Sequence, residues 1–277
     1  MKAWSLFVAG AVVVAGCHHM RPVVAEPPSA SGSPVAAEDH TALLSAQGAD
    51  AVLWQATSAE AHRLYQQAYE LARIRLAENL LQPDKRPPAV IVDIDETVLD
   101  NSPYQVNAVR QGRTFDQAEW KVWTDKATAK ASPGAVEFLR YADQQGCDIF
   151  YITNRDIRER ASTLKNLNDL GFPDADEAHL LLMEGTSDKT ERRAYVSRDY
   201  QVVLLVGDQL RDFDERFKDR SVNYGKDLVD AMADTLSRYF ILLPNPMYGT
   251  YRDALQGKGT DAEKYARMRA WFEQQNR

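Results

Sequence analysis

The feature that most constrains this chain is a short apolar run that ends in a cluster of acidic residues. Residues 89–92 read Ala-Val-Ile-Val, and residues 93–100 read Asp-Ile-Asp-Glu-Thr-Val-Leu-Asp. An apolar run without polar alternation predicts a strand buried on both faces, as in a parallel sheet. Ligands of such sheets bind outside the carboxyl ends of the strands. We therefore expect the acidic cluster to lie at a functional site.

Asp93 and Asp95 are two residues apart, so their side chains point the same way on an extended chain. Two neighbouring carboxylates repel each other, and a cation or a strong hydrogen-bond network is needed to keep both ionised. Oxygen ligands without Cys or His suit Mg²⁺, which usually keeps several waters and a substrate phosphate. The alternative interpretation is an acidic N-cap at a strand-to-helix turn, where Asp and Thr are common.

Composition narrows the range of functions. The chain has 277 residues, of which 44% are apolar and 26% charged, and its net charge is −7. This predicts one main globular domain with an accessory part. The negative charge argues against a nucleic-acid polymer as a partner, because its backbone would require a basic face on the protein.

The N-terminal residues predict an export signal that is not part of the fold. Lys2 precedes the apolar stretch 6–15, which is too short to span a bilayer, and residues 14–17 read Val-Ala-Gly-Cys. This stretch resembles a bacterial lipoprotein signal, which implies removal of residues 1–16 and lipidation of Cys17. A plain secretory signal is the alternative.

Lipidation of Cys17 would anchor the protein to a membrane of the bacterial cell envelope, and His18 in place of Asp is compatible with the outer membrane. Residues 17–40 are rich in Pro, Ala and Ser and predict a disordered tether. Cys147 lies in an apolar run, so we expect a buried thiol and no internal disulfide.

The rest of the chain alternates predicted helices and strands. Apolar residues at helical spacing predict N-terminal cover helices within residues 41–88, serving as scaffold, and a helical insertion at about 101–132. Further strands are expected at 148–152, 180–182, 202–206 and 239–243, with helices at 132–145 and 157–170. The pattern predicts an α/β fold over residues 89–265, with a parallel sheet flanked by helices on both faces.

Polar residues stand at the carboxyl ends of four predicted strands. They are Asp93 and Asp95 after the first, Thr153, Asn154 and Arg155 after the second, Lys189 after the third, and Asp208 and Asp212 after the fourth. The carboxyl ends of parallel strands meet at one edge of a sheet, so we expect these side chains to form a single site.

These residues resemble the motifs of the haloacid dehalogenase superfamily. Asp93-x-Asp95-x-Thr97 resembles its first motif, Thr153 its second, Lys189 its third and Gly207-Asp208-x-x-x-Asp212 its fourth. The resemblance implies a Rossmannoid parallel sheet with a smaller, mainly helical cap. Residues 91–104 and 206–213 resemble, more narrowly, the bacterial class C acid phosphatases, also called the lipoprotein e(P4) family. Gln209 departs from that family, whose members usually have Asn or Thr there.

The resemblance implies an acid phosphatase that uses Mg²⁺ to hydrolyse phosphomonoesters, with 5′-nucleotides and nicotinamide mononucleotide prominent among them. Asp93 would be the nucleophile and would form an aspartyl-phosphate. Asp95 would act as general acid and then as general base. Thr153, Asn154 and Lys189 would bind the transferring oxygens. A homodimer is implied by the family alone.

The same resemblance gives Asp93, Asp208 and the backbone carbonyl of Asp95 as metal ligands, while Asp212 either binds through water or orients Lys189. Arg155, Trp120 and Tyr248 are the expected substrate-binding residues. The two aromatic residues are candidates to hold a flat leaving group, but packing is the commoner use of Trp. Trp123, Tyr104 and Tyr251 compete with them for that role.

A second hypothesis is a non-catalytic surface lipoprotein that binds a solute or a partner protein on a phosphatase-like fold. Such a protein would ordinarily have lost Asp93, Asp95 or Lys189. All three residues are present.

Overall fold

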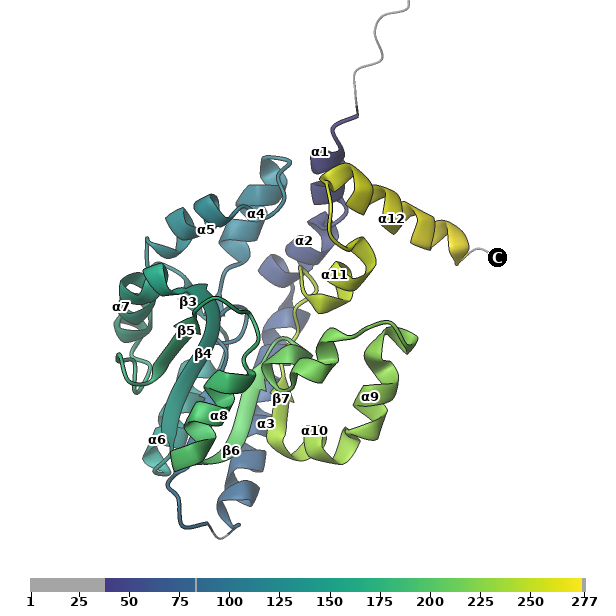
Figure 1. Cartoon of the computed structure of the whole chain (residues 1–277). Coiled ribbons are helices and arrows are strands. Elements are labelled where there is room, and N and C mark those ends of the chain that lie inside the picture. Colours follow the sequence, from purple (N-terminus) through teal and green to yellow (C-terminus); the bar gives the residue numbers. More distant parts are fainter. Residues whose placement is uncertain (1–37, 83, 276–277) are drawn as a thin grey trace, which may run out of the picture. The chain divides into compact units, whose positions relative to one another are not determined.

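One parallel sheet organises the described part of the chain, which in this computed structural model is residues 38–82 and 84–275 (Figure 1). Its five strands lie in the order β5-β4-β1-β6-β7, with every neighbouring pair parallel. The strands are β1 Pro88–Val92, β4 Asp148–Asp156, β5 Leu180–Met183, β6 Gln201–Gly207 and β7 Phe240–Leu242. The strand that precedes the acidic cluster, β1, is therefore central.

Helices connect the strands and extend the chain at both ends. The α-helices are α1 His40–Ala46, α2 Ala49–Thr57, α3 Ala59–Leu80, α4 Ser102–Arg110, α5 Gln117–Thr124, α6 Ala135–Gln144, α7 Arg160–Leu170, α8 Thr190–Asp199, α9 Lys226–Ala231, α10 Ala233–Tyr239, α11 Thr250–Gln256 and α12 Asp261–Gln274. Short 3₁₀ helices are η1 Ile157–Glu159, η2 Leu210–Asp212, η3 Glu215–Lys218 and η4 Asn223–Gly225. None of the described helices has both the length and the apolar character needed to cross a membrane.

The predicted α/β fold class and its strands are confirmed, with two differences. Strand β4 continues to Asp156, so residues 153–155 are the last part of the strand and do not follow it. The insertion also opens and closes with an antiparallel pair, β2 Leu99–Asp100 and β3 Lys130–Ala131, which the sequence did not predict. Two-residue strands are too short to give a periodic pattern. Residues 1–37, with the predicted signal, Cys17 and most of the tether, lie outside the described residues.

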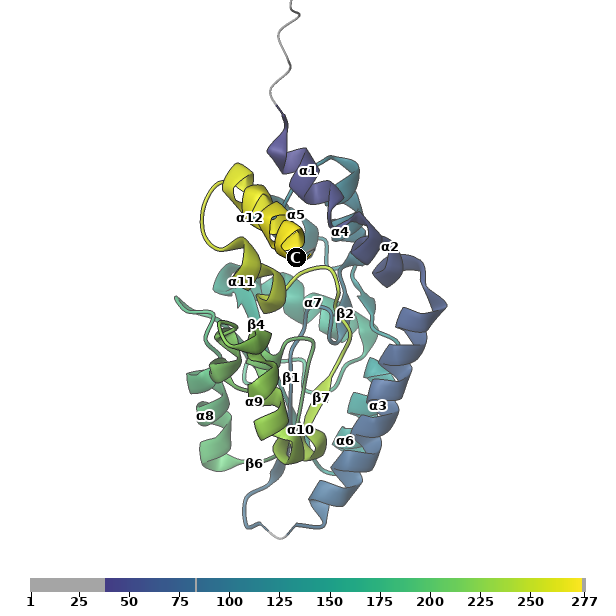
Figure 2. The ribbon, with the colours of Figure 1, turned by 90° about the vertical axis from the view of Figure 1, so that its right-hand side faces the viewer.

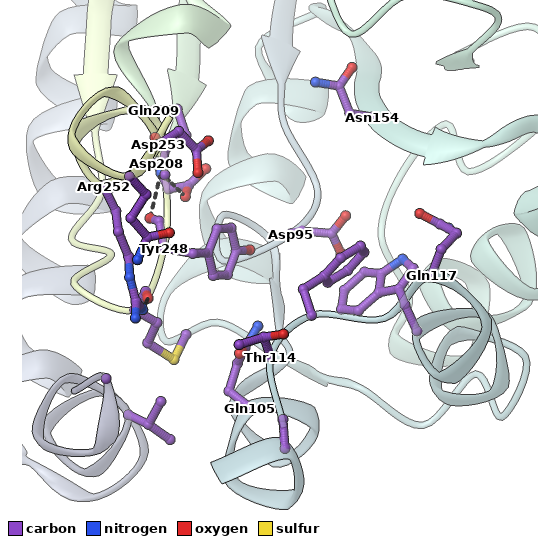
Figure 3. A pocket seen from close by; sticks show the side chains of 18 of the residues that line it. Asp95, Gln105, Thr114, Gln117, Asn154, Asp208, Gln209, Tyr248, Arg252 and Asp253 are labelled. Carbon is purple, nitrogen blue, oxygen red and sulfur yellow. Dashed lines mark hydrogen bonds between the residues drawn. The ribbon is translucent and has the colours of Figure 1, made fainter. Parts of the chain in front are cut away.

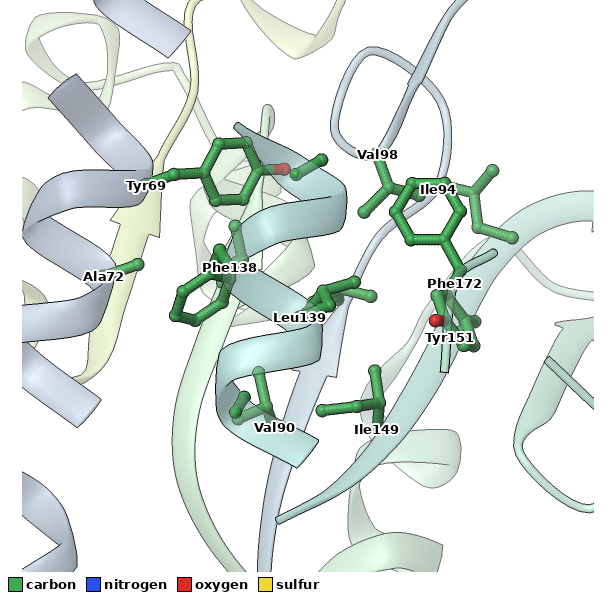
Figure 4. Packing of buried hydrophobic residues seen from close by; sticks show 14 of the residues in the cluster. Tyr69, Ala72, Val90, Ile94, Val98, Phe138, Leu139, Ile149, Tyr151 and Phe172 are labelled. Carbon is green, nitrogen blue, oxygen red and sulfur yellow. The ribbon is translucent and has the colours of Figure 1, made fainter. Parts of the chain in front are cut away.

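Helices cover both faces of the sheet because both faces are apolar. Val90 and Val92 of β1 face a core to which α3, α6 and α7 contribute, whereas Ala89 and Ile91 face a smaller cluster with Val196 of α8. Figure 2 shows α8 on the opposite side of the sheet from α3 and α6. Figure 4 shows the larger core, where Tyr69 of α3 and Phe138 of α6 pack between the layers, with ring centroids 5.6 Å apart. The thiol of Cys147 is buried, as predicted.

Helix α3 also fixes the loop that follows β1. The hydroxyl of Tyr65 donates a hydrogen bond to the carbonyl of Glu96 at 2.8 Å, and that of Tyr69 donates to the carbonyl of Thr97 at 2.9 Å. Both tyrosines are buried. The predicted scaffold role of this cover helix thus includes direct support of the acidic loop.

Candidate active site

Asp93 occupies the first position after the central strand. Its backbone N–H donates to the carbonyl of Val206 in β6 at 2.9 Å, so the sheet ladder continues through this residue. The chain then turns sharply, because the N–H groups of Val98 and Leu99 both donate to the carbonyl of Ile94 at 2.9 Å. Glu96 takes a positive φ of 56° within this turn. The backbone around Asp93 is therefore fixed by the sheet on one side and by a tight turn on the other.

Three carboxylates meet at the carboxyl edge of the sheet, and Lys189 contacts two of them. One oxygen from each of Asp93, Asp208 and Asp212 lies within 4.8 Å of the others. The Lys189 ammonium donates to Asp93 Oδ1 at 2.5 Å and to Asp212 Oδ1 at 2.7 Å, and its side chain is only 4% exposed. Of the two predicted roles for Asp212, contact with Lys189 is present in the structure.

The electrostatics of this carboxylate group favour an added cation. Burial, together with the other carboxylates, raises the pKa of Asp208 and of Asp93 above the usual value of 3.8. Burial alone would lower the pKa of Lys189, but Asp212 and Asp93 raise it overall, so the ammonium stays charged. One positive charge cannot balance three carboxylates, and a set of oxygen ligands suits a hard divalent metal ion.

Asp208 is held in one orientation by two side-chain amides. Gln209 Nε2 donates to Asp208 Oδ2 at 2.9 Å, and Asn245 Nδ2 donates to the same oxygen at 2.7 Å. Because both donors bind one oxygen, rotation of the carboxylate is restricted. Asn245 lies between two prolines in the loop after β7, and it is not among the site residues predicted from the sequence.

The Asp95 carboxylate is paired with a different cation. Arg155 donates to Asp95 Oδ1 through Nε at 3.0 Å and through Nη2 at 2.8 Å, and Asn101 Nδ2 donates to the same oxygen at 2.9 Å. The Arg155 side chain is 1% exposed and that of Asp95 is 17% exposed. Asp95 is thus neutralised separately, and its carboxylate is not part of the group formed by Asp93, Asp208 and Asp212.

The two residues before Arg155 differ in where their side chains lie. Thr153 is buried, and its hydroxyl is 3.5 Å from Asp95 Oδ2. Asn154 is exposed, with its amide donating to the carbonyl of Ser187 at 3.1 Å and its oxygen accepting from Arg192 at 2.7 Å. Thr153 therefore lies next to Asp95, the expected general acid and base, whereas the Asn154 side chain contacts the loop before Lys189.

A cavity of about 570 Å³ opens from these residues. Asp93, Asp95, Lys189, Asp208 and Asp212 line one part of it. Figure 3 shows Tyr248 and Asp95 among the side chains that line the cavity. The cavity thus has a charged part, lined by these five residues, and a larger part lined by the other residues.

The two aromatic candidates have different surroundings. Trp120 is buried and packs edge-on against Tyr104, with ring centroids 5.1 Å apart, although it also borders the cavity. Tyr248 is partly exposed on the loop after β7 and also borders the cavity. Packing thus accounts for much of the Trp120 surface, while Tyr248 keeps part of its surface open.

Sequence analysis missed the walls of this cavity that come from the two ends of the described chain. Leu44 and Val52 contribute from α1 and α2, and Arg252 and Gln256 contribute from α11. Arg252 joins these ends, because its Nη2 donates to the carbonyl of Leu44 at 3.1 Å. No motif marks such residues, since they meet only through the tertiary fold.

The central strand, the Asp-x-Asp loop after it and the lysine between two carboxylates together define a phosphatase site of the haloacid dehalogenase type. The chain belongs to the HAD superfamily, subfamily IIIB (acid phosphatase), whose family model matches residues 30–251.

Solved structures and curated relatives agree with this family. The class C acid phosphatase from Bacillus anthracis superposes with a TM-score of 0.75 at 38% identity, covering 82% of this chain and 97% of that one. The same protein with tungstate bound gives a TM-score of 0.74 at 36% identity, with the same coverage of both chains. Acid phosphatase 1 of Solanum lycopersicum is 30% identical over 167 residues, and this match spans 57% of both chains.

Proposed function

We propose that the protein is a Mg²⁺-dependent acid phosphatase that hydrolyses phosphomonoesters, with 5′-nucleotides and nicotinamide mononucleotide as its substrate class. The observation that carries the proposal is the contact of Lys189 with both Asp93 and Asp212, beside Asp208, at the carboxyl edge of the sheet. A buried group of this charge is costly unless it binds an ion or a charged ligand. Family membership supports the same reaction.

In this proposal, Asp93 attacks the phosphorus and forms an aspartyl-phosphate, which divides one difficult displacement into two steps. Asp95 protonates the leaving oxygen and then accepts a proton from the water that hydrolyses the intermediate. Arg155 and Thr153 orient the Asp95 carboxylate for both transfers. Lys189 stabilises the negative charge of the transferring group.

Asp93, Asp208 and the backbone carbonyl of Asp95 are the proposed Mg²⁺ ligands. When bound, the ion would neutralise the charge that otherwise keeps a phosphate dianion away from Asp93. The two amides on Asp208 Oδ2 restrict that carboxylate in advance, which lowers the cost of ordering it when the ion binds.

The larger part of the cavity is the proposed leaving-group site. The volume of the whole cavity, about 570 Å³, falls within the range of about 300–1,000 Å³ that is usual for small-molecule sites. Tyr248 offers a partly exposed ring there, which suits a flat group such as a nucleobase. Trp120 and Arg155 border the same space and remain proposed substrate contacts.

The proposal places the protein in the bacterial cell envelope, attached to the outer membrane through lipidated Cys17, and it includes a homodimer. The support for the anchor is the sequence of residues 14–17. Labelling with a fatty acid should mark the wild-type protein and not a Cys17→Ala variant. Gel filtration with light scattering should give twice the mass of one chain.

The reaction is tested with p-nitrophenyl phosphate at mildly acidic pH, with and without EDTA. Metal-dependent hydrolysis that is lost in Asp93→Asn, while the variant remains folded, supports the proposal. Absence of hydrolysis at every pH would favour the non-catalytic lipoprotein instead. A panel of nucleotides and sugar phosphates ranked by kcat/KM then tests the substrate class, because this ratio measures discrimination between substrates.

A further inference from the structure

Gln209 connects the carboxylate group to the loop of residues 244–250, which we call the Tyr248 loop. Its side-chain Nε2 donates to Asp208 Oδ2 at 2.9 Å and lies 3.3 Å from the carbonyl of Tyr248. Its Oε1 accepts a hydrogen bond from the backbone N–H of Thr250 at 3.2 Å. One side chain therefore contacts a proposed metal ligand and the backbone on both sides of Gly249.

The backbone of Gln209 adds a contact to a second carboxylate. Its N–H donates to Asp212 Oδ2 at 2.9 Å, while Asp212 Oδ1 accepts from Lys189. Movement of this residue would thus disturb Asp208 through the side chain and Asp212 through the main chain. Nothing in the proposed chemistry requires these additional contacts to the Tyr248 loop.

The fit between Gln209 and the loop depends on a glycine. Gly249 has a φ of +138°, and a Cβ on this residue would lie 2.2 Å from Gln209 Oε1 and 2.5 Å from Nε2. Such distances are far below van der Waals contact, so any side chain at position 249 would displace the Gln209 amide or the loop. The Gln209 amide occupies the space that this glycine leaves open.

We infer that Gln209 is a positioning residue that couples the geometry of the Asp208 metal site to the placement of the Tyr248 loop. This inference rests on the proposed function, because it assigns the metal to Asp208 and the leaving group to the Tyr248 side of the cavity. The glutamine side chain is long enough to reach Tyr248 and Thr250 as well as Asp208.

The test is a double-mutant cycle on Mg²⁺ affinity, measured by calorimetric titration of the metal-free full chain with Mg²⁺ alone. Gly249→Ala changes the loop, and its Cβ meets the Gln209 amide and no carboxylate among the nearest atoms. Coupling through Gln209 predicts that Gly249→Ala weakens Mg²⁺ binding about fivefold in the wild-type background, as expected for the net contribution of one typical hydrogen bond. In the Gln209→Ala background, the same change should have a smaller effect, because only the contact of Asn245 with Asp208 then links the loop to the metal site.

An unchanged Mg²⁺ affinity in Gly249→Ala, or an equal loss in both backgrounds, would overturn the inference. Gln67→Ala, on an exposed position of α3, is the matched control and should bind Mg²⁺ like the wild type. If Gly249→Ala does not fold, Gln209→Ala alone decides the question. This variant should bind Mg²⁺ more weakly than the wild type. Its KM should rise about tenfold for a nucleoside monophosphate but less than about twofold for glycerol phosphate. An equal change in KM for both substrates, or an unchanged Mg²⁺ affinity, would overturn the inference.

The calorimetric readout separates this inference from the proposed function. A wild-type chain that binds Mg²⁺ but hydrolyses no phosphomonoester would refute the proposed function, and the cycle would still measure coupling. A wild-type chain that is an active phosphatase, with additive effects of the two substitutions, would refute the coupling alone.

Discussion

Arg155 and Asp95 form an ion pair in which two guanidinium nitrogens, at 2.8 and 3.0 Å, donate to one carboxylate oxygen. The arginine also donates to Thr163 in α7 at 3.2 Å, so the pair is attached to the body of the fold. Sequence analysis counted Arg155 among the substrate-binding residues. Its contacts in the structure are those of a group that orients Asp95, and contact with a substrate remains a proposal.

Asp95→Asn should therefore affect both stability and activity. The substitution leaves the Arg155 guanidinium, 1% exposed, without its ionised partner. Loss of one partner from a buried pair is costly, and we expect the free energy of unfolding to fall by about 2–3 kcal/mol. Urea denaturation measures this change. In the double variant Asp95→Asn with Arg155→Met, stability should recover in part while activity remains absent.

Asp93→Asn should behave differently, although it too should abolish turnover. Burial and the carboxylates of Asp212 and Asp95 raise the pKa of Asp93, so its charge destabilises the metal-free fold, and Lys189 keeps Asp212 as a partner. We expect at least about a 10³-fold loss of kcat, because the nucleophile is removed. The melting temperature of the metal-free protein should be equal to the wild type or higher. Turnover at the wild-type rate would contradict the assignment of Asp93.

Stability of the metal-free protein should depend on pH in a characteristic direction. Burial raises the pKa of Asp93 to about 7 and also raises that of Asp208, against an ordinary value of 3.8. Between about pH 4 and pH 7 the folded state then binds more protons than the unfolded state, so stability falls as pH rises.

Mg²⁺ should reverse this trend, because its carboxylate ligands must be deprotonated. Thermal unfolding at pH 5 and pH 7, in metal-free buffer and with Mg²⁺, measures both effects. The increase in melting temperature on adding Mg²⁺ should be larger at pH 7. An increase that is equal at the two pH values would argue against Asp93 and Asp208 as ligands.

The sequence predicts the site residues best where they directly follow a strand or form its last residues. The apolar run at 89–92 and the acidic residues after it predicted the central strand, and the polar residues after later strands predicted which side chains meet. Parallel strands impose this outcome, because their carboxyl ends share one edge. The sequence could not predict that Asp93 pairs with Lys189 while Asp95 pairs with Arg155. In an extended strand, side chains two residues apart point to the same side, but the turn at residues 94–99 ends the extended conformation between these two residues.

Tyr248→Ala and Trp120→Ala should separate substrate binding from packing. Tyr248 is partly exposed at the cavity, so its loss should raise KM for a nucleoside monophosphate several-fold with little change in melting temperature. Trp120 packs against Tyr104 and Phe115, and its truncation should cost about 3 kcal/mol of stability. Steady-state kinetics and urea denaturation of both variants provide the measurements. Equal effects on stability would contradict this division of roles.

Most residues of the proposed leaving-group site could not be predicted from the sequence, for a physical reason. Residues of α1, α2 and α11 reach the cavity only because the two ends of the described chain are joined by contacts such as that of Arg252 with Leu44. Helical periodicity identifies the apolar face of a helix but not its neighbour in the fold. The segment 41–88 is accordingly predicted as scaffold, which describes α3 but not the cavity-lining residues of α1 and α2.

Helices α1, α2 and α11 form one wall of the cavity, while the strand tips hold the charged groups, so segments far apart in the sequence line the two parts of the site. Substitutions in α1, α2 or α11 can reshape the wall against which a leaving group rests without altering the acidic loop. Under the proposed function, a library confined to residues 44–52 and 251–256 should therefore change the preferred ester while leaving Gly249 and the acidic loop intact.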